Sequence, residues 1–253
     1  MKTILLFSGL GKHLAFITVF FMLWATNAPA QNTRQTEKEI IAKLTRYEVK
    51  SGYREPFRKA LSDYVLHSLA MESNIMSEAY YEQENQHILW LIERWTNKTE
   101  LDKFTGSIEF KAIETLVKET LVSSPKIFYV EDLEPLTKQQ WRKTAKKDDS
   151  TFTVMLFVDA KAGTQQTFID LYSVAMPKFR SEAGVVTYQL SQLQEDATQF
   201  VTYEKFRNEE AFQYHLDFRP IQPVIKYLET SIKKQPFQSG LHRLIEFAPL
   251  TRE

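Results

Sequence analysis

The sequence predicts an α+β fold made of two similar units, each with the element order βαββαβ, which pack sheet against sheet within one chain. Two observations carry this prediction. The stretch "LIERWTNKTEL" at 91–101 returns as "TYEKFRNEEAF" at 202–212, with glutamate, an aromatic residue and asparagine at the same spacing. Five pairs of equivalent residues also lie 111 positions apart: Gly52 and Gly163, Phe57 and Phe168, Glu93 and Glu204, Asn97 and Asn208, and Pro125 and Pro236. Self-similarity at a fixed spacing indicates a duplicated structural unit.

The first unit, residues 39–135, begins with a predicted strand at 39–49 that is rich in β-branched and aromatic residues. After a break at Gly52, apolar residues at intervals of three and four predict a helix over 53–69. Two strands follow at 74–82 and 87–95, separated by the polar turn "QENQ". A short helix at 99–104, a striped helix at 110–121 and a strand at 126–133 complete the unit.

The second unit, residues 151–250, repeats this order. It has a predicted strand at 151–160, a break at Gly163 and a helix whose apolar stripe covers 168–179. Strands at 184–193 and 199–206 flank the polar turn "QEDAT". A short helix at 209–216, a striped helix at 221–232 and a strand at 241–250 follow. The element order is therefore the same in both units.

The order βαββαβ is the ferredoxin-like arrangement, which predicts a four-stranded antiparallel sheet with helices on one face. Segments such as "HILWLI" carry apolar residues on both sides, so the open face of each sheet needs a cover. The sheet of the other unit can supply it. The joining segment 136–150 is polar and charge-rich, and we interpret it as an exposed linker.

The N-terminus has the pattern of a signal peptide. An apolar run from Leu14 to Trp24 precedes Ala28 and Ala30, which form a small-x-small cleavage pattern. We expect residues 1–30 to be removed, the protein to be exported to the periplasm or the medium, and no stable membrane anchor to remain. The alternative is a permanent anchor, although the run is about half of the ~20 residues that a spanning helix needs.

Charge and composition exclude several classes of protein. Loss of residues 1–30 removes two lysines and no acidic residue, leaving 30 basic and 32 acidic residues and no electrostatic footprint for nucleic acid. The absence of cysteine excludes a thiol nucleophile and thiolate metal sites. No histidine spacing indicates a metal site, although a histidine haem ligand stays possible. Hydrolase, kinase and dinucleotide-binding motifs are missing.

Several short segments resemble the antibiotic biosynthesis monooxygenase family of the dimeric α+β barrel superfamily. The second unit carries "GVVTY" at 184–188, "YEKF" at 203–206 and "AFQYHL" at 211–216, and the first carries "ERW" at 93–95 and "TELDKF" at 99–104. The resemblance covers nearly all of the expected mature chain, in tandem. It implies an intrachain dimeric α+β barrel, and hence a monomer. Many such proteins are cofactor-free oxygenases, so it also implies O₂ and a small aromatic quinol or phenol as reactants.

The resemblance also implies site residues. We expect His215 to act as catalytic base or hydrogen-bond donor, and Tyr188, Tyr203, Tyr214 and Phe206 to contact the substrate between sheet and helices. The alternatives are a satisfied histidine and packing aromatics. In the first unit Phe104 stands in place of His215, and Glu78 matches Tyr188 if Asn74 matches Gly184. We therefore place the active pocket in the second unit.

The repeated acidic and amide residues have simpler interpretations. Asn97 and Asn208 precede short helices, where an asparagine caps the first turn, so capping is favoured over catalysis. Glu93 and Glu204 could be bases with a raised pKa, but a partner for lysine or arginine is favoured. The alternative function for the whole chain is a periplasmic small-ligand-binding or assembly protein without chemistry.

Overall fold

The structure is a computed structural model that describes residues 40–234 and 239–249. The predicted signal peptide, residues 1–30, lies outside the described residues. No helix in the described part of the chain has the length and apolar character needed to cross a membrane.

Both units contain the elements that the sequence predicts. The first has β1 (Ile41–Glu48), α1 (Arg54–Ala70), β2 (Asn74–Glu82), β3 (Ile88–Trp95), α2 (Lys98–Phe104), α3 (Ile108–Thr120) and β4 (Lys126–Leu133). The second has β5 (Phe152–Asp159), α5 (Gln165–Ser181), β6 (Val185–Leu193), β7 (Gln199–Phe206), α6 (Glu209–Asp217), the 3₁₀ turn η1 (Arg219–Ile221), α7 (Gln222–Thr230) and β8 (Leu241–Ala248). Gly52 and Gly163 both have a positive φ, of 91° and 85°, so both copies use glycine for the same left-handed turn.

The eight strands form one closed antiparallel sheet in the order β1-β3-β2-β8-β5-β7-β6-β4. Each unit supplies the ferredoxin-like order, β4-β1-β3-β2 and β8-β5-β7-β6, and the units join through the pairs β2–β8 and β4–β6. The predicted α+β barrel within one chain is confirmed. Each edge strand therefore pairs with a strand of the other unit over part of its length, so neither sheet ends in an unpartnered strand.

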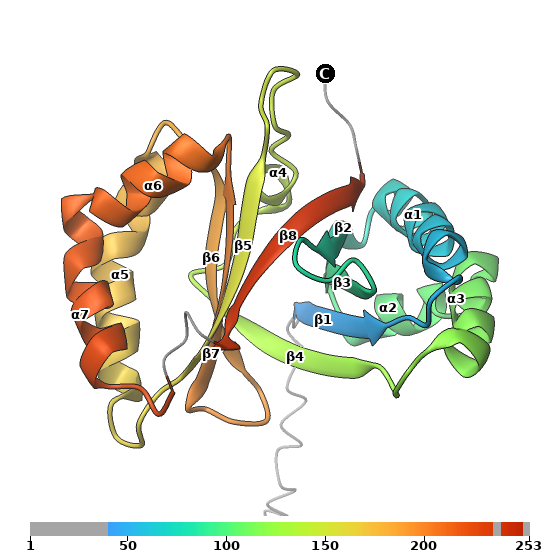
Figure 1. The fold of residues 1–253 in the computed structure, drawn as a ribbon, viewed down its shortest axis with the longest axis horizontal. Coiled ribbons are helices and arrows are strands. Elements are labelled where there is room, and N and C mark those ends of the chain that lie inside the picture. The colour runs from blue at the N-terminus through green and yellow to red at the C-terminus, as the bar shows by residue number, and fades with distance from the viewer. Residues whose placement is uncertain (1–39, 235–238, 250–253) are drawn as a thin grey trace, which may run out of the picture. The chain divides into compact units, whose positions relative to one another are not determined.

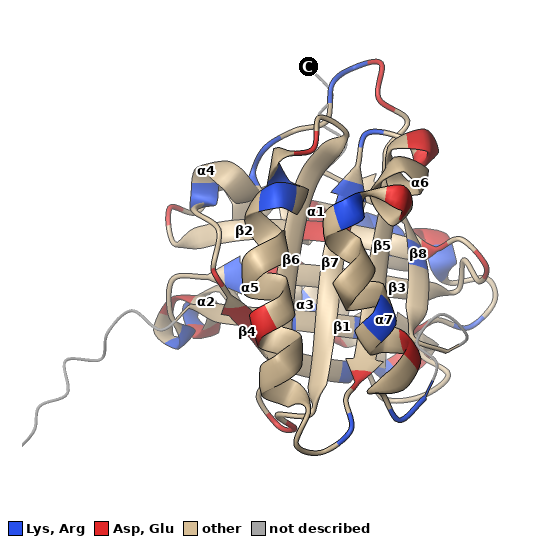
Figure 2. Cartoon of the chain, turned by 90° about the vertical axis from the view of Figure 1, so that its left-hand side faces the viewer, with Lys and Arg blue, Asp and Glu red and all other residues tan. Residues whose placement is uncertain are grey.

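Helices cover the outer face of each half of the sheet. In Figure 1 α1, α2 and α3 lie on one side of the strands, and α5, α6 and α7 lie on the other. Figure 2 looks onto α5 and α7 and shows acidic and basic segments interspersed over that side. Two apolar cores fill the helix–sheet layers, and a third, which includes Tyr80, Trp90 and Tyr203, fills the interior of the closed sheet.

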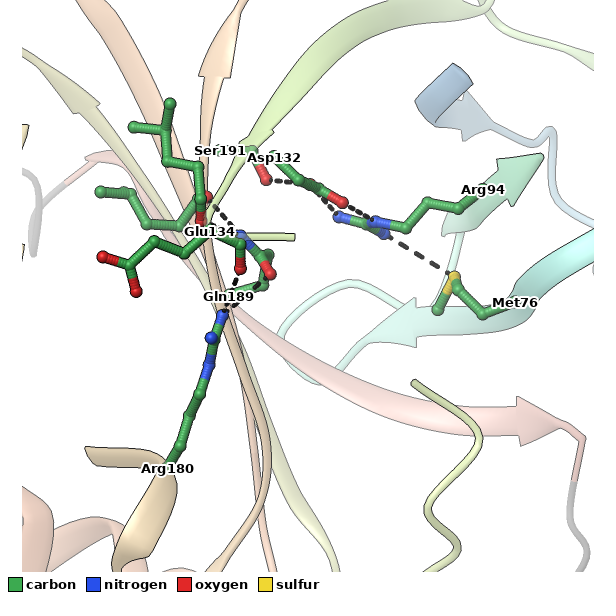
Figure 3. A network of polar contacts seen from close by, with 9 residues as sticks. Met76, Arg94, Asp132, Glu134, Arg180, Gln189 and Ser191 are labelled. Atoms are coloured by element: carbon green, nitrogen blue, oxygen red, sulfur yellow. Dashed lines mark hydrogen bonds and ion pairs between the residues drawn. The ribbon is translucent and has the colours of Figure 1, made fainter. Parts of the chain in front are cut away.

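Polar side chains reinforce the seam between β4 and β6 (Figure 3). The guanidinium of Arg94 donates two hydrogen bonds to Asp132, of 2.6 and 2.8 Å. The hydroxyl of Ser191, in the other unit, donates to the same carboxylate at 2.6 Å. Gln189 donates to the carbonyl oxygen of Leu133 at 2.6 Å. Both charges of the central pair are buried, so its bidentate geometry and the added hydroxyl offset its desolvation.

The joining segment is not simply an exposed linker, which corrects one prediction. It forms α4 (Lys138–Trp141), whose N-terminal Thr137 makes a reciprocal capping box with Gln140. Trp141 is 2% exposed and lies over Arg94, with the guanidinium carbon 3.9 Å from the ring centroid. Most polar residues of the segment face solvent, but the side chain of Trp141 closes this end of the sheet interior. A single tryptophan in a charged segment gives little periodic signal, so the sequence pattern did not reveal this role.

Candidate functional site

Alternation along β7 sorts the residues of the second unit between two compartments. Strand side chains point to opposite faces in turn. Tyr203 belongs to the core inside the closed sheet, whereas Phe206 belongs to the core beneath α5, α6 and α7. Glu204 lies across from Tyr188 of β6 and lines a cavity on the helix side. The repeated segment thus places one carboxylate under the helices.

Helix α6 places His215 in the lining of the same cavity as Glu204. Asn208 caps the helix by accepting a hydrogen bond from the N–H of Ala211 at 2.8 Å, and Asn97 caps α2 in the same way at 3.0 Å. The capping prediction is therefore confirmed for both asparagines. The cap fixes the start of α6, and His215 comes two turns later on its buried face with 0% exposure.

The imidazole of His215 is held by one carboxylate and three aromatic rings. Its Nδ1 lies 2.7 Å from Oε1 of Glu182, just before β6. The rings of Phe179, Tyr188 and Phe206 have centroids 4.7, 5.2 and 5.3 Å from the imidazole. When Glu182 is ionised, Nδ1 carries the donated hydrogen, and Nε2 of the neutral ring is left as the basic atom. Nε2 is buried and has no hydrogen-bond partner among the described residues.

Glu204 is the second titratable group of the site. Its Oε1 accepts hydrogen bonds from the hydroxyls of Tyr188, at 2.9 Å, and Thr202, at 2.7 Å. Burial raises the pKa of this carboxyl above its ordinary value, although the hydrogen bonds from Thr202 and Tyr188 oppose the shift. No lysine or arginine of the described chain pairs with it, so the favoured interpretation as an ion-pair partner is wrong for Glu204.

A narrow cavity of about 30 Å³ runs between these groups and the helices. Its lining includes Tyr188, Glu204, His215 and Tyr172, together with apolar residues of α6, η1 and α7. Such a volume accommodates a water molecule or two. Tyr172 of α5 also lines an adjoining pocket of about 220 Å³, which opens between α5, β6 and the residues after β4. One side chain therefore borders both spaces.

The first unit fills the equivalent place with an ion pair. Glu93 is fully buried, and it accepts hydrogen bonds from Lys43 at 2.8 Å, Tyr64 at 2.7 Å and the indole of Trp95 at 2.8 Å. The prediction that this glutamate pairs with a lysine is confirmed. Phe104, at the position of His215, packs on Tyr64 and Trp95 with ring centroids 5.2 and 5.0 Å apart.

Strand register corrects one equivalence between the units. Tyr188 faces Glu204, and Ser77 faces Glu93, so Ser77 is the counterpart of Tyr188. Glu78 was predicted to take that place, on the assumption that Asn74 matches Gly184. Asn74 instead matches Val185, because both stand opposite the last aromatic residue of the neighbouring strand and before a bulge. A shift of one residue moves a side chain to the other face of the sheet.

Three of the five predicted site residues meet at the helix-side cavity. Tyr188 and His215 line it, and the ring of Phe206 lies against the imidazole. Tyr203 points into the closed sheet, where its hydroxyl lies 2.7 Å from that of Tyr80. Tyr214 is 61% exposed on α6 and stacks on Phe218. The last two therefore lie outside this cavity, since adjacent strand residues and adjacent helix residues face different ways.

Sequence reasoning missed Glu182 and Tyr172 as members of the site. Glu182 lies in the turn before β6, and nothing in its spacing sets it apart from other surface acids. Tyr172 belongs to the apolar stripe of α5 and is indistinguishable there from a packing residue. Among residues 40–234 and 239–249, no group of three or more histidine, cysteine or acidic side chains is arranged to hold a metal ion.

Comparison with known proteins identifies the family. The model of the family described as "Antibiotic biosynthesis monooxygenase" matches residues 40–115 and 151–222, once in each unit. No match was found among curated proteins.

Solved structures show the same tandem fold. A candidate monooxygenase of Lactobacillus acidophilus NCFM superposes with a TM-score of 0.68 at 15% identity, covering 82% of this chain and 94% of that one. A second, from Fusobacterium nucleatum, gives 0.67 at 14% identity, with coverage of 82% and 92%. A protein described as anthrone oxidase-like gives 0.54 at 12% identity, with coverage of 83% and 92%. Since the family model matches more than half of the residues, the chain belongs to the antibiotic biosynthesis monooxygenase family, with two copies of its domain in tandem.

Proposed function

We propose that this protein is an exported, cofactor-independent monooxygenase that oxidises a quinol or another electron-rich phenol in the second unit. The observation that carries the proposal is the pairing of two proton-accepting groups, Glu204 and His215, with the hydroxyl of Tyr188 around one cavity. Family membership supports the reaction class, and the first unit, with its glutamate held by a lysine, supports a single site per chain.

The chemistry begins with removal of a phenolic proton. A phenolate gives an electron to O₂ far more readily than the neutral phenol does, so the base controls the rate. A carboxylate with a raised pKa is a stronger base than an ordinary one, which suits Glu204 to this step. The unpaired Nε2 of His215 is the second acceptor, and Glu182 orients its ring. Tyr188 stays neutral because burial and the charge of Glu204 raise its pKa, so it serves as a hydrogen-bond donor.

The overall reaction needs no external reductant. A quinol and one O₂ give a hydroxyquinone and one water, so the substrate supplies both electrons and both hydrogens for the oxygen atom that leaves. A ring carbon forms a bond to one oxygen atom of O₂, and the resulting peroxide accepts the proton that the base removed earlier. The O–O bond and the C–H bond of that carbon then break, so the carbon keeps one oxygen atom as a carbonyl and the other leaves as water with both hydrogens. Glu204 and His215 therefore act first as proton acceptors and then as proton donors.

Access requires a movement of Tyr172. The inner cavity is too small for an aromatic ring, whereas the adjoining pocket of about 220 Å³ can receive one. Tyr172 lines both spaces; its ring centroid lies 4.9 Å from that of Phe168 and 6.2 Å from that of Phe179, and its hydroxyl is hydrogen-bonded to Tyr188. We propose that rotation of this side chain joins the two spaces and brings the substrate hydroxyl to Glu204.

Oxygen uptake tests the proposal. Purified protein without residues 1–30 is mixed with a panel of substituted hydroquinones and naphthohydroquinones, and uptake is recorded with an electrode. The expected result is uptake above buffer, with one atom of ¹⁸O₂ in the product, and a loss of about 100-fold in His215→Ala. His67→Ala, at a partly exposed histidine of α1, is the matched control and should retain full activity. Uptake equal to buffer for every substrate would refute the enzyme.

The small inner cavity favours one rival, a binding protein without turnover. A phenol that raises the melting temperature but is recovered unchanged under O₂ would support binding alone. Export and a monomeric state are parts of the same proposal. The first rests on the pattern at residues 14–30 and is tested by N-terminal sequencing of protein from the cell exterior or periplasm. The second is supported by the pairing of every sheet edge within one chain, and light scattering tests it.

A further inference from the structure

A second cavity lies at the end of the closed sheet beside α4. It has a volume of about 240 Å³, and it shares no lining residue with the helix-side cavity. Its polar lining comes from both units and from the joining segment: Glu78 of β2, Lys205 of β7, Glu246 of β8, and Arg142, Lys143 and Thr144 after α4. The joining segment exists because the two units share one chain, so this cavity is a product of the tandem arrangement.

The carboxylate of Glu78, at the floor of this cavity, already has its hydrogen-bond partners within the protein. Glu78 accepts hydrogen bonds from Lys205 at 2.8 Å, from Tyr80 at 2.6 Å and from Tyr203 at 2.5 Å. Lys205 also lies 3.2 Å from Glu246. Burial lowers the pKa of Lys205, but the charges of Glu78 and Glu246 raise it more, so the ammonium stays protonated. Burial likewise raises the pKa of Glu78, and the contact with Lys205 and the two tyrosines lowers it more. The floor is therefore a fixed set of charges.

The opening of this cavity is lined by one fixed cation and by hydrogen-bond donors that have no close acceptor. Arg142 is fixed in place by donating to the carbonyl oxygens of Leu69, Asn74 and Ile75, at 2.8 to 3.1 Å. The ammonium of Lys143 has only a 3.5 Å contact with a backbone carbonyl. The hydroxyls of Thr144 and Thr151 have no hydrogen-bond partner in the part of the chain that the structure describes.

The balance of charge favours a negative ligand. Three cationic side chains, of Arg142, Lys143 and Lys205, face two carboxylates, of Glu78 and Glu246. The remaining walls are apolar and include Trp141, Met76 and Pro249. A molecule bound at the opening would contact an excess of positive charge and hydrogen-bond donors without partners. Flat or apolar side chains would lie beside it.

We propose that this end cavity binds a small organic anion, a carboxylate carried on a flat apolar body of about the size of benzoate. The carboxylate accepts hydrogen bonds from Lys143 and the threonine hydroxyls beside the fixed guanidinium of Arg142, and the body lies against Trp141 and Met76. The site is independent of the oxidation proposed for the second unit, because the two cavities open on opposite faces of β7.

Calorimetric titration with sodium benzoate tests the site, and benzamide serves as the neutral probe of the same shape. Benzoate should bind, benzamide should bind at least about ten-fold more weakly, and added salt should weaken benzoate. Lys143→Glu should also reduce benzoate affinity by at least about ten-fold. Lys147→Glu makes the same charge change on an exposed residue of the same segment outside the lining, and it should bind as wild type.

Two further variants locate the binding. Ala145→Phe fills the mouth without a charge change and should abolish the titration, while His215→Ala should leave it unaltered. The proposal is overturned if benzoate gives no heat up to tens of millimolar, or if benzamide binds equally well. It is also overturned if Lys143→Glu binds as wild type, or if His215→Ala removes binding, because that result would place benzoate in the helix-side cavity.

Discussion

The two helix-covered layers of this protein share one backbone and differ in what surrounds one glutamate. In the first unit Glu93 is paired with Lys43 and enclosed by Tyr64 and Trp95. In the second, Glu204 receives only hydroxyl groups, since Val154 replaces the lysine directly opposite it. A strand position that fixes an ion pair in one copy thus carries a carboxyl with a raised pKa in the other. The lysine opposite Glu93 and the valine opposite Glu204 account for this difference between the two carboxyl groups.

The residue at the matching place on the short helix completes the contrast. Phe104 packs into the aromatic cluster of the first unit, whereas His215 brings a carboxylate partner and an unpaired ring nitrogen into the second. A buried unpaired polar atom costs stability, and the proposed role of Nε2 as a proton acceptor gives a physical reason for it. The first unit supplies strands β2 and β4 to the seams and keeps its own layer filled. On the proposed function, the first copy supports the sheet and the second carries the site of oxidation.

The largest expected effect is a difference in turnover between variants of Glu204 and Glu93. Glu204→Gln removes the proposed base without changing its size, so oxygen uptake should fall by about 10²- to 10⁴-fold. Glu93→Gln makes the same change in the first unit and should retain most activity in whatever fraction stays folded. Steady-state uptake, normalised to folded protein by circular dichroism, gives the comparison. Equal losses in the two variants would show that the units do not differ in function.

Stability should show the reverse order. Glu93→Gln leaves the ammonium of Lys43 buried without its counter-charge, which costs about 3–5 kcal/mol of unfolding free energy. Glu204→Gln leaves no buried cation behind and should cost far less. Because the pKa of Glu204 is raised on folding, the wild-type carboxyl stabilises the fold at low pH. That contribution is lost as the pH rises through the pKa of Glu204 in the folded state. Above pH 4.5 the unfolding free energy of Glu204→Gln therefore increases relative to that of wild type.

Urea unfolding of both variants between pH 4 and pH 8 measures this difference. Lys59→Gln, at an exposed helical ion pair of the first unit, is the control and should change stability by less than about 1 kcal/mol. The comparison fails if Glu93→Gln proves as stable as Glu204→Gln at neutral pH.

The sequence predicted the fold well because each signal is local and occurs in both units. Each strand and helix has its own periodicity, and the 111-residue offset repeats Gly52 at Gly163 and Asn97 at Asn208. The site was harder, because Glu182 and Glu204 acquire their roles only when α6 packs on β6 and β7. Tyr203 shows the same limit: alternation along β7 decides which compartment it enters, and a strand with apolar residues on both faces does not reveal which face is which.

Restoring the lysine tests whether its absence defines the second unit. Val154→Lys places an ammonium opposite Glu204, as Lys43 stands opposite Glu93. An opposite charge at that distance lowers a carboxyl pKa by about one to three units. The acidic limb of the pH profile of kcat/KM should therefore move to lower pH, with a lower plateau because the base is weaker. Val154→Met, of similar length and uncharged, should leave the limb in place, and an unshifted limb in the lysine variant would contradict the assignment of Glu204.

The smallest effect concerns the tyrosines, which the sequence could not rank. Tyr188→Phe removes the 2.9 Å hydrogen bond to Glu204 and the proposed donor to the substrate, so turnover should fall by about ten-fold. The same loss of a donor raises the pKa of Glu204 further, which moves the acidic limb to higher pH, opposite to the effect of Val154→Lys. Tyr214→Phe alters an exposed hydroxyl on α6 and should change neither quantity. If Tyr214→Phe reduced turnover as much as Tyr188→Phe, the substrate would bind on the outer surface of α6, and the helix-side cavity would not be the site of oxidation.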